Sequence, residues 1–146
     1  MPKVTPFLWF DAPLDEAVAY YKSIFTNARV LSQTPMSATF EIEGQTFYAL
    51  GGGPQFKFNE AISFFIECKD QEEVDRYWGK LTADGGAESQ CGWLKDKYGL
   101  SWQVIPATLT RYLSDKDRAK SQRVMQAMLQ MKKIDVAALD RAAAAA

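Results

Sequence analysis

The side chains that ordinary enzymes use for catalysis are sparse in this sequence. The chain contains no histidine, which excludes Ser-His-Asp and Cys-His catalysis and removes the commonest general base and the commonest transition-metal ligand. Three side chains are weak candidates for chemistry: Tyr48 as an acid group, Cys91 as a nucleophile and Gln103 as a hydrogen-bonding group. Because no histidine can serve as their base, the catalytic residues stay unassigned.

The stretch GGGPQFKF, Gly51 to Phe58, allows two interpretations. A glycine-rich loop followed by a helix can hold a phosphate through its backbone amides. Here the glycines lead into another extended stretch, and Pro54 stiffens the chain that follows. The stretch is therefore interpreted as a joint between two structural units, with Gln55 and Lys57 at the rim of a ligand cavity.

The composition is that of one ordinary globular domain. Of the 146 residues, 47% are hydrophobic and 24% are charged, so neither disorder nor a membrane protein is indicated. The net charge of -1 argues against nucleic-acid binding. The N-terminus, MPKVTPFLWFD, has the character of neither a signal peptide nor a membrane span. We expect a cytoplasmic protein in which Cys68 and Cys91 are free thiols.

The first half of the chain predicts a strand, a helix and three further strands. Residues 3–10 are extended in character, and Asp11 lies near the start of a helix. This helix has an apolar face formed by Val18, Tyr21, Ile24 and Phe25. The stretches ARVLSQT, MSATFEIEG and QTFYALGG then predict strands, with a hairpin turn at Gly44.

The same order recurs in the second half. The stretch EAISFFIEC predicts a strand, and a helix follows that ends at Gly85-Gly86 and has an apolar face of Val74, Tyr77, Trp78 and Leu81. Strands are predicted in ESQCGWLKD and LSWQVIP, with a short additional one near residues 87–90. In both halves a glycine precedes an aromatic residue by three positions, Gly44 before Phe47 and Gly99 before Trp102. This match favours an internal duplication.

Residues 108–146 have helical periodicity. A helix is predicted to begin at Asp115 or Asp117, and the terminal alanines are expected to fray. Its apolar stripe comprises Val124, Met128, Leu129 and Met131. We expect this extension to dock on the preceding domain or on a dimer partner.

Several strings together resemble a known family: PFLWFD, EAVAYY, FYALGGGP, ISFFIEC, VDRYW, CGWLKDKYG, SWQVIP and RVMQAMLQMKKID. They are similar to the PhnB-like branch of the vicinal oxygen chelate superfamily, which includes glyoxalase I, bleomycin-resistance proteins and extradiol dioxygenases. This branch often carries the label 3-demethylubiquinone methyltransferase-like. The resemblance implies paired βαβββ modules, usually in a homodimer, with a cavity inside each cup of strands.

The resemblance also implies where a metal would bind in relatives that need one. Its ligand positions, in the first and last strands of each module, fall near Thr5, Phe7, Ala61, Ser63, Tyr48 and Gln103. Because these positions offer no histidine or carboxylate, we expect no metal and no cofactor. The nearest carboxylates are Glu41, Glu43 and Glu67. Glu41 and Glu43 share one face of a strand, so a metal site would need that face to point inward.

Strand alternation predicts the lining of the cavity. If Leu8, Phe10, Ile62, Phe64 and Ile66 pack under the helices, the opposite faces carry Phe7, Trp9, Tyr48, Ser63, Phe65, Ser101 and Gln103. Such a lining suits a flat or apolar small molecule held by stacking and a few hydrogen bonds. The alternative is that these side chains fill a collapsed cup or a dimer contact.

The sequence therefore predicts an α+β fold in which residues 1–107 form two βαβββ modules, units 3–51 and 60–106. Their strands are expected to form a curled mixed sheet around a cleft, followed by the helical extension 108–146. A metal-free, homodimeric small-molecule-binding protein is the leading functional interpretation. One alternative is an enzyme acting on a small aromatic or quinone-like compound, including a metal-dependent lyase, dioxygenase or transferase as in the superfamily. Another is a packed cup whose surface serves assembly.

Overall fold

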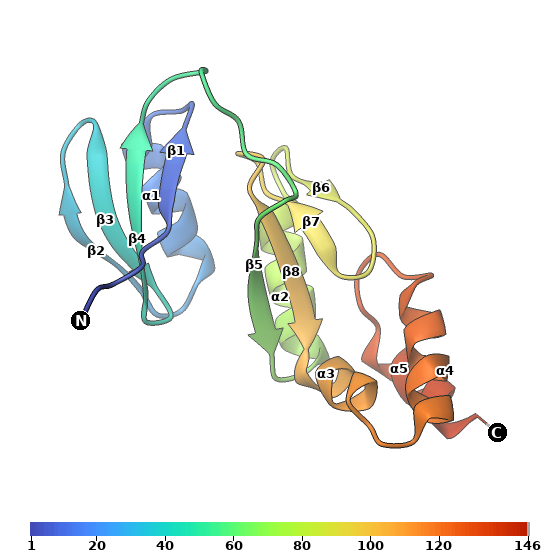
Figure 1. The fold of residues 1–146 in the computed structure, drawn as a ribbon. Helices are drawn as coiled ribbons and strands as arrows, with labels where there is room; N and C mark the ends of the chain where they lie inside the picture. Colours follow the sequence, from blue (N-terminus) through green and yellow to red (C-terminus); the bar gives the residue numbers. More distant parts are fainter. Residues whose placement is uncertain (146) are drawn as a thin grey trace. The chain divides into compact units, whose positions relative to one another are not determined.

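The computed structural model describes residues 1–145, in which the chain forms two compact units (Figure 1). Unit 1 is Met1–Phe58, and unit 2 begins at Asn59. Each unit contains a four-stranded mixed sheet, and the helical extension belongs to unit 2. The α+β class, with two βαβββ modules and a C-terminal helical extension, is confirmed. Within the described residues the strands lie in two sheets and not in one continuous sheet.

Unit 1 consists of β1 (Phe7–Phe10), α1 (Leu14–Ile24), β2 (Ala28–Gln33), β3 (Ser37–Ile42) and β4 (Gln45–Gly51). The strand order is β1-β4-β3-β2, with β1 parallel to β4 and the other neighbours antiparallel. The hairpin between β3 and β4 turns at Gly44, whose φ of 82° favours glycine. This is the turn that the sequence predicts.

Helix α1 covers one face of the unit 1 sheet. The predicted apolar face is confirmed, since Val18, Tyr21, Ile24 and Phe25 are buried. Asp11 lies near the helix start but does not cap it, because the residue before the first helical position is Pro13 and no side chain caps the helix there. Proline carries a backbone φ close to that of a helix, so it starts α1 without a capping hydroxyl or carboxylate.

Unit 2 repeats the arrangement with β5 (Ser63–Cys68), α2 (Gln71–Thr82), β6 (Ala87–Glu88), β7 (Trp93–Lys95) and β8 (Ser101–Pro106). The strand order is β5-β8-β7-β6, with β5 parallel to β8. The Asp70 side chain accepts a hydrogen bond from Glu73 N, while Glu73 Oε1 accepts one from Lys69 N. This reciprocal cap fixes the start of α2, whose predicted apolar face is buried: Val74, Tyr77, Trp78 and Leu81.

The inward positions of β5 differ in part from the prediction. Ile62 is 69% exposed, because β5 begins one residue later at Ser63. Phe64 and Ile66 are partly buried on the side of α2, and Cys68 at the end of the strand is fully buried. Alternation therefore holds within the strand and fails at the residue before it.

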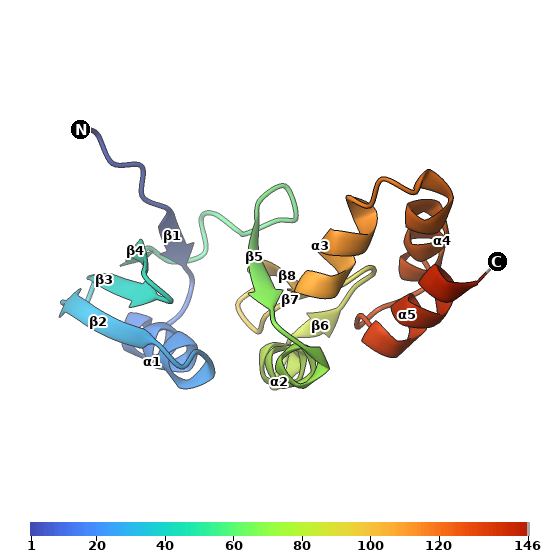
Figure 2. The same cartoon turned by 90° about the horizontal axis from the view of Figure 1, so that it is seen from below.

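Three helices form the extension: α3 (Ala107–Leu113), α4 (Arg118–Met128) and α5 (Val136–Ala144). They pack around a hydrophobic cluster of Ile105, Leu109, Val124, Ile134, Leu139 and Ala143. In unit 2, α2 and α3 lie on opposite sides of the sheet (Figure 2). No helix within residues 1–145 combines the length and the apolar character needed to cross a bilayer.

The extension matches the predicted pattern at some residues and departs from it at others. Asp117 is the cap of α4, accepting a hydrogen bond from Lys120 N at 3.2 Å. Leu129 is 50% exposed, because α4 ends one residue before it. The alanines through Ala144 lie in α5. The Arg123 guanidinium donates to the carbonyl oxygens of Ala142 and Ala143, which holds the end of α5 against α4.

Candidate functional site

The face of the unit 2 sheet opposite α2 carries most of the polar and aromatic side chains that alternation predicts. The registers of β5, β8 and β7 place side chains side by side in rows across this face. The first row is Phe65, Gln103 and Trp93, and the second is Ser63, Ser101 and Lys95. Since successive side chains point to opposite faces of a strand, each row shares one side of the sheet.

The two rows are joined by a hydrogen bond, which Gln103 Nε2 donates to Ser63 Oγ at 3.0 Å. Ser101 is 1% exposed, and its Oγ has no hydrogen-bond partner within the described residues. A buried hydroxyl without a partner costs about 1–3 kcal/mol. At the edge of the second row, Lys95 Nζ lies 2.8 Å from Glu60 Oε1, and this hydrogen bond holds the pKa of the Glu60 carboxyl below its usual range.

A pocket of about 480 Å³ lies between this face and the helices α3 and α4. The sheet and the loop before β7 contribute Phe65, Cys91, Trp93, Gln103 and Ile105. The helices contribute Leu109, Thr110, Leu113, Ser114 and Met128. None of these side chains is a carboxylate, an ammonium or a guanidinium, so the pocket is apolar with a few neutral hydrogen-bonding groups.

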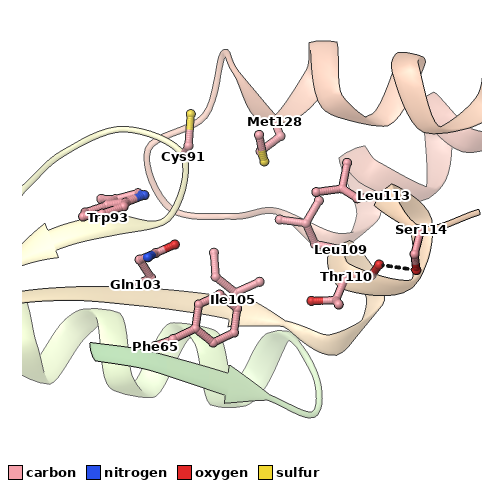
Figure 3. Close-up of a pocket in the computed structure, with 10 residues that line it drawn as sticks. All are labelled: Phe65, Cys91, Trp93, Gln103, Ile105, Leu109, Thr110, Leu113, Ser114 and Met128. Carbon is pink, nitrogen blue, oxygen red and sulfur yellow. Dashed lines mark hydrogen bonds between the residues drawn. The ribbon is translucent and has the colours of Figure 1, made fainter. Parts of the chain in front are cut away.

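The lining side chains face one another across the pocket (Figure 3). Gln103 and Trp93 lie close together at one end, and Leu109 and Leu113 from α3 lie at the other. Met128 reaches toward them from α4 (Figure 3). The arrangement can hold a flat apolar molecule between aromatic and aliphatic walls, with the Gln103 amide at one end.

Cys91 lines the pocket without the surroundings of an activated nucleophile. Its sulfur is directed away from Trp93 and Gln103 (Figure 3). The pocket lining contains no basic side chain that could remove the thiol proton. A reactive cysteine needs a nearby cation or base, and the pocket lining supplies neither to Cys91. Cys68 and Cys91 are both free thiols, as predicted.

The remaining predicted cavity residues lie in unit 1. Phe7 is 60% exposed and Tyr48 is 42% exposed, and their rings meet edge to face at 6.1 Å. The indole of Trp9 is partly buried, and its Nε1 donates to the Gly53 carbonyl oxygen at 2.9 Å. Gly53 belongs to the glycine run, which continues as loop and not as a helix. The run therefore holds a tryptophan in place, a role that the sequence does not predict.

The sequence thus predicts part of the pocket lining. Phe65, Gln103 and the weak candidate Cys91 line it, while Ser63 and Ser101 lie on the same sheet face next to it. The missed lining residues are Trp93, Ile105, Leu109, Thr110, Leu113, Ser114 and Met128. Alternation around the buried Leu94 could have found Trp93. No sequence pattern could place the helical residues in the pocket, since their position depends on how the extension packs.

The sequence model of one family, described as 3-demethylubiquinone-9 3-methyltransferase, matches residues 2–105. The chain belongs to this family. Its fold and structural relatives lie in the vicinal oxygen chelate superfamily, as the resemblance implied. None of the curated proteins compared with the chain matches it significantly.

Solved structures of similar proteins support this assignment. A putative 3-demethylubiquinone-9 3-methyltransferase, PhnB protein, from Bacillus cereus is 30% identical, with a TM-score of 0.65 and coverage of 72% of this chain and 99% of that chain. The fosfomycin resistance protein FosX from Listeria monocytogenes, complexed with Mn(II) and sulfate, is 17% identical, with a TM-score of 0.54 and coverage of 70% and 87%. A glyoxalase-related enzyme from Fulvimarina pelagi is 14% identical, with a TM-score of 0.53 and coverage of 73% and 88%. The last two likenesses show the fold alone.

The metal positions that the superfamily resemblance implies do not fit a divalent ion in this family member. Those positions hold threonine, phenylalanine, alanine, serine, tyrosine and glutamine. These side chains lack the carboxylate and imidazole groups that hold such ions. Residues 1–145 also contain no group of three or more His, Cys, Asp or Glu side chains placed to bind a metal.

Two of the three carboxylates considered from the sequence, Glu41 and Glu43, have partners in unit 1, and the third, Glu67, lies in β5 of unit 2. Glu41 lies on the sheet face opposite α1, where its Oε2 is 3.1 Å from Arg29 Nη2. Glu43 does not share that face, because β3 ends at Ile42 and Glu43 lies in the hairpin turn with a φ of 49°. Its carboxylate accepts hydrogen bonds from N and Nδ2 of Asn27. The expected pairing of Glu41 with Glu43 on one strand face is therefore wrong.

Proposed function

We propose that this family member binds a small, uncharged, largely apolar molecule in the pocket of unit 2. The observation that carries the proposal is a pocket of about 480 Å³ whose lining contains no ionised side chain. Pockets for small molecules usually measure about 300–1,000 Å³ and combine an apolar lining with a few polar groups. A charged ligand would lose its hydration there without gaining a partner of opposite charge.

The Gln103 amide orients the ligand in this proposal. Its Nε2 is held by Ser63 Oγ at 3.0 Å, so its Oε1 serves as an acceptor for a ligand hydroxyl. The rings of Phe65 and Trp93 provide surfaces on which an aromatic ligand stacks. The proposed ligand therefore has an aromatic body and a hydroxyl group at the Gln103 end.

The direct test uses 2-naphthol as a neutral aromatic probe, with binding measured by calorimetry. Replacing Phe65 by alanine removes one stacking surface, and we expect affinity to fall about tenfold. The matched control is Phe56→Ala in unit 1, since Phe56 is 57% exposed and Phe65 is 54% exposed. Equal affinities for all three proteins, or no binding by the native chain to a panel of neutral aromatic compounds, would contradict the proposal.

A second candidate is an enzyme acting on a small aromatic or quinone-like compound in the same pocket. The observation that favours it is the name of the matched family, which describes a methyl transfer to a demethylubiquinone. Against a methyl transfer stands the fold, since the doubly wound methyltransferase sheet carries a glycine-rich turn into a helix and Gly51–Gly53 lead into a loop. Mass analysis of hydroquinones incubated with the protein distinguishes the two, because turnover changes the compound and binding does not.

Metal independence is part of the proposal. The donor set at the superfamily positions supports it, because it contains no carboxylate and no imidazole. Elemental analysis of the natively purified protein is the test. Zinc, nickel or manganese at one equivalent per chain, together with ligand binding that is lost on chelation, would overturn this part.

We also propose a homodimer. The open face of the unit 1 sheet supports it, since Phe7 and Tyr48 are largely exposed there and a second copy would bury them. Light scattering on the native protein is expected to give twice the mass of the chain, and Phe7→Glu is expected to shift it toward the monomer. A monomer at all concentrations would contradict this proposal without affecting the pocket.

A further inference from the structure

The helices that form one side of the pocket lie beyond the residues matched by the family model. That match ends at residue 105, and 72% of this chain is enough to cover 99% of the Bacillus cereus relative. Helices α3 to α5 begin at Ala107. The family match therefore does not describe the role of the extension, although its string RVMQAMLQMKKID resembles the PhnB-like branch.

The extension is fastened to unit 2 near the pocket by backbone hydrogen bonds. Cys91 N donates to the Met131 carbonyl oxygen, and Gly92 N donates to that of Lys132, both at 2.8 Å. These amides belong to the loop before β7, which also contributes Cys91 to the pocket lining. These hydrogen bonds therefore fix the loop and the segment after α4 relative to one another beside the pocket.

A second attachment lies at the start of α2. Gln71 Nε2 donates to the Ile134 carbonyl oxygen at 3.0 Å, and Gln71 Oε1 accepts from Val136 N at 2.7 Å. Lys133 Nζ also lies 2.8 Å from Asp75 Oδ1. With β8 leading directly into α3, the extension is attached at three places, so its position against the sheet is defined.

The attached helices supply the aliphatic half of the pocket. Leu109, Leu113 and Met128 face the aromatic and amide groups of the sheet (Figure 3). Aliphatic side chains and a methionine thioether are good partners for the face and edge of an aromatic ring. Without them, the sheet would offer a ligand one exposed face and no opposite wall.

The positions of the charged residues in the extension indicate which class of ligand the pocket over the sheet binds. Three charged residues of the extension line a neighbouring pocket, which shares Leu113 and Ser114 with the pocket over the sheet: Asp115, Lys116 and Arg118. None of them lines the pocket over the sheet. The extension thus forms one wall of the pocket over the sheet and adds no charged side chain to its lining.

We propose that the extension selects the ligand, by forming the second wall of a pocket for an uncharged aromatic compound over the open sheet face. The ligand lies between Phe65 and Trp93 on one side and Leu113 and Met128 on the other. The inference rests on the proposed function and assigns to α3 and α4 the discrimination between neutral and charged ligands of one shape. A sheet face without this cover would bind both forms weakly, because water would still solvate the charge.

The test compares 2-naphthol with 2-naphthoate, which have the same ring system and differ in charge. The native chain is expected to bind 2-naphthol at least about tenfold more tightly. Thr110→Trp places an indole from α3 into the pocket, and Thr110 is exposed enough to accept it. We expect this variant to bind 2-naphthol about tenfold more weakly. The control Arg111→Trp lies on the same helix outside the pocket lining and should bind within about twofold of the native chain.

An independent readout uses protein labelled with ¹³C at the methionine methyl groups. The methyl signal of Met128, which lines the pocket, is expected to shift on addition of 2-naphthol. Met125, on the same helix and 46% exposed, does not line the pocket and serves as an internal control. This measurement needs no substitution, so it stays decisive if the Thr110→Trp chain fails to fold.

The outcomes separate this inference from the proposed function. Weakening by Phe65→Ala with no effect of Thr110→Trp and no shift of Met128 would overturn the role of the extension and leave binding at the sheet intact. Equal weakening by Thr110→Trp and Arg111→Trp would show an effect on folding alone and would also overturn it. Equal affinities of the native chain for the two probes would refute the selection. No binding of either probe, or of other neutral aromatic compounds, would overturn both proposals.

Discussion

The two βαβββ modules have the same elements in the same order but differ at the last residue of their last strand. In unit 1 the register pairs Phe10 with Gly51, and in unit 2 it pairs Cys68 with Pro106. After Gly51 the chain continues through two more glycines into a loop, whereas after Pro106 it begins α3. Proline suits a helix start, whereas three successive glycines disfavour a helix because each loses much backbone freedom.

This difference decides what covers the second face of each sheet. One helix buries one face of a four-stranded sheet, and the other face needs a second layer to become an interior. Unit 2 provides that layer from its own chain through α3 and α4, and a pocket lies between them and the sheet. Phe65 in unit 2 and Phe7 in unit 1 occupy matching positions and are 54% and 60% exposed, so the added layer forms a pocket beside Phe65 without burying its ring. Duplicated sequence therefore does not mean duplicated chemistry.

The largest effect is expected at the hairpins before the last strands. In unit 2 the buried Asp96 accepts hydrogen bonds from Tyr98 N, Leu100 N and Trp102 Nε1. Asp96→Ala leaves these donors without their acceptor and should lower the free energy of unfolding by about 4 kcal/mol. In unit 1 the exposed Glu43 fills the hairpin turn, and Glu43→Ala should cost less than about 1 kcal/mol. Urea unfolding measures the free energy of unfolding of both variants, and equal losses would contradict this difference between the two hairpins.

The next effect contrasts two glycines with the same φ of 86°, Gly92 and Gly53. A Cβ at Gly92 would lie 2.6 Å from Ile105 Cδ1 and 3.2 Å from Ile134 Cγ1, where the extension meets the sheet. Gly92→Ala should therefore cost about 3 kcal/mol through overpacking added to backbone strain.

A Cβ at Gly53 would meet nothing within 4 Å. Gly53→Ala should cost about 1–2 kcal/mol, the strain of the left-handed backbone alone. Chemical denaturation gives both values. A Gly92→Ala chain no less stable than Gly53→Ala would mean that the extension can move away from the sheet at little cost.

A smaller effect is expected where the glycine run touches Trp9. A Cβ on Gly52 would overlap the Trp9 indole, so Gly52→Ala should displace the ring and break its hydrogen bond to Gly53. We expect a loss of about 1–2 kcal/mol and a shift of the Trp9 indole NMR signal. The control is Gly79→Ala inside α2, where a Cβ meets nothing and helix propensity favours alanine. An unchanged Trp9 signal would contradict this role of the run.

The smallest effect concerns the ends of the first strands, where Phe10 and Cys68 occupy matching buried positions. Burial, with a contribution from the negative charge of Glu73, raises the pKa of the Cys68 thiol from 9.0 to about 12. Above the unfolded pKa only the unfolded thiol loses its proton, so stability falls as pH rises from 9.0 toward about 12.

The measurement compares the native chain with Cys68→Ala. From about pH 8 to about pH 10 the stability advantage of the native chain should shrink by about 1 kcal/mol. Phe10 has no ionisable group, so Phe10→Leu should keep a constant difference from the native chain over the same range. A pH-independent difference for Cys68→Ala would show that the thiol ionises equally in both states.

Much of the fold could be predicted because it depends on local patterns. The apolar face of α2, including Val74 and Leu81, follows from a period of 3.6 residues. Asp117 predicts the start of α4, because its carboxylate can cap backbone amides. The errors also have local causes, since Pro13 replaces a side-chain cap and β5 begins after Ile62.

The candidate site could be predicted only on its sheet side. Alternation is enough to place Phe65 and Gln103 on one face, because the period of a strand is a property of the backbone. Leu113 and Met128 could not be assigned to the pocket, since their position depends on contacts between segments far apart in the sequence. The Gln71 bridge to Ile134 and Val136 is one such contact.

The sequence by itself determined the α+β class, the duplicated modules, the family and which side chains share a strand face. It did so because helix and strand periods, turns and caps act over a few residues. Only the tertiary structure decided which open face is covered, that Ser101 is buried without a partner in the described residues, and that α3 and α4 close a pocket. A sequence pattern predicts which side chains lie on the same face of a helix or strand. What packs against that face depends on the whole chain.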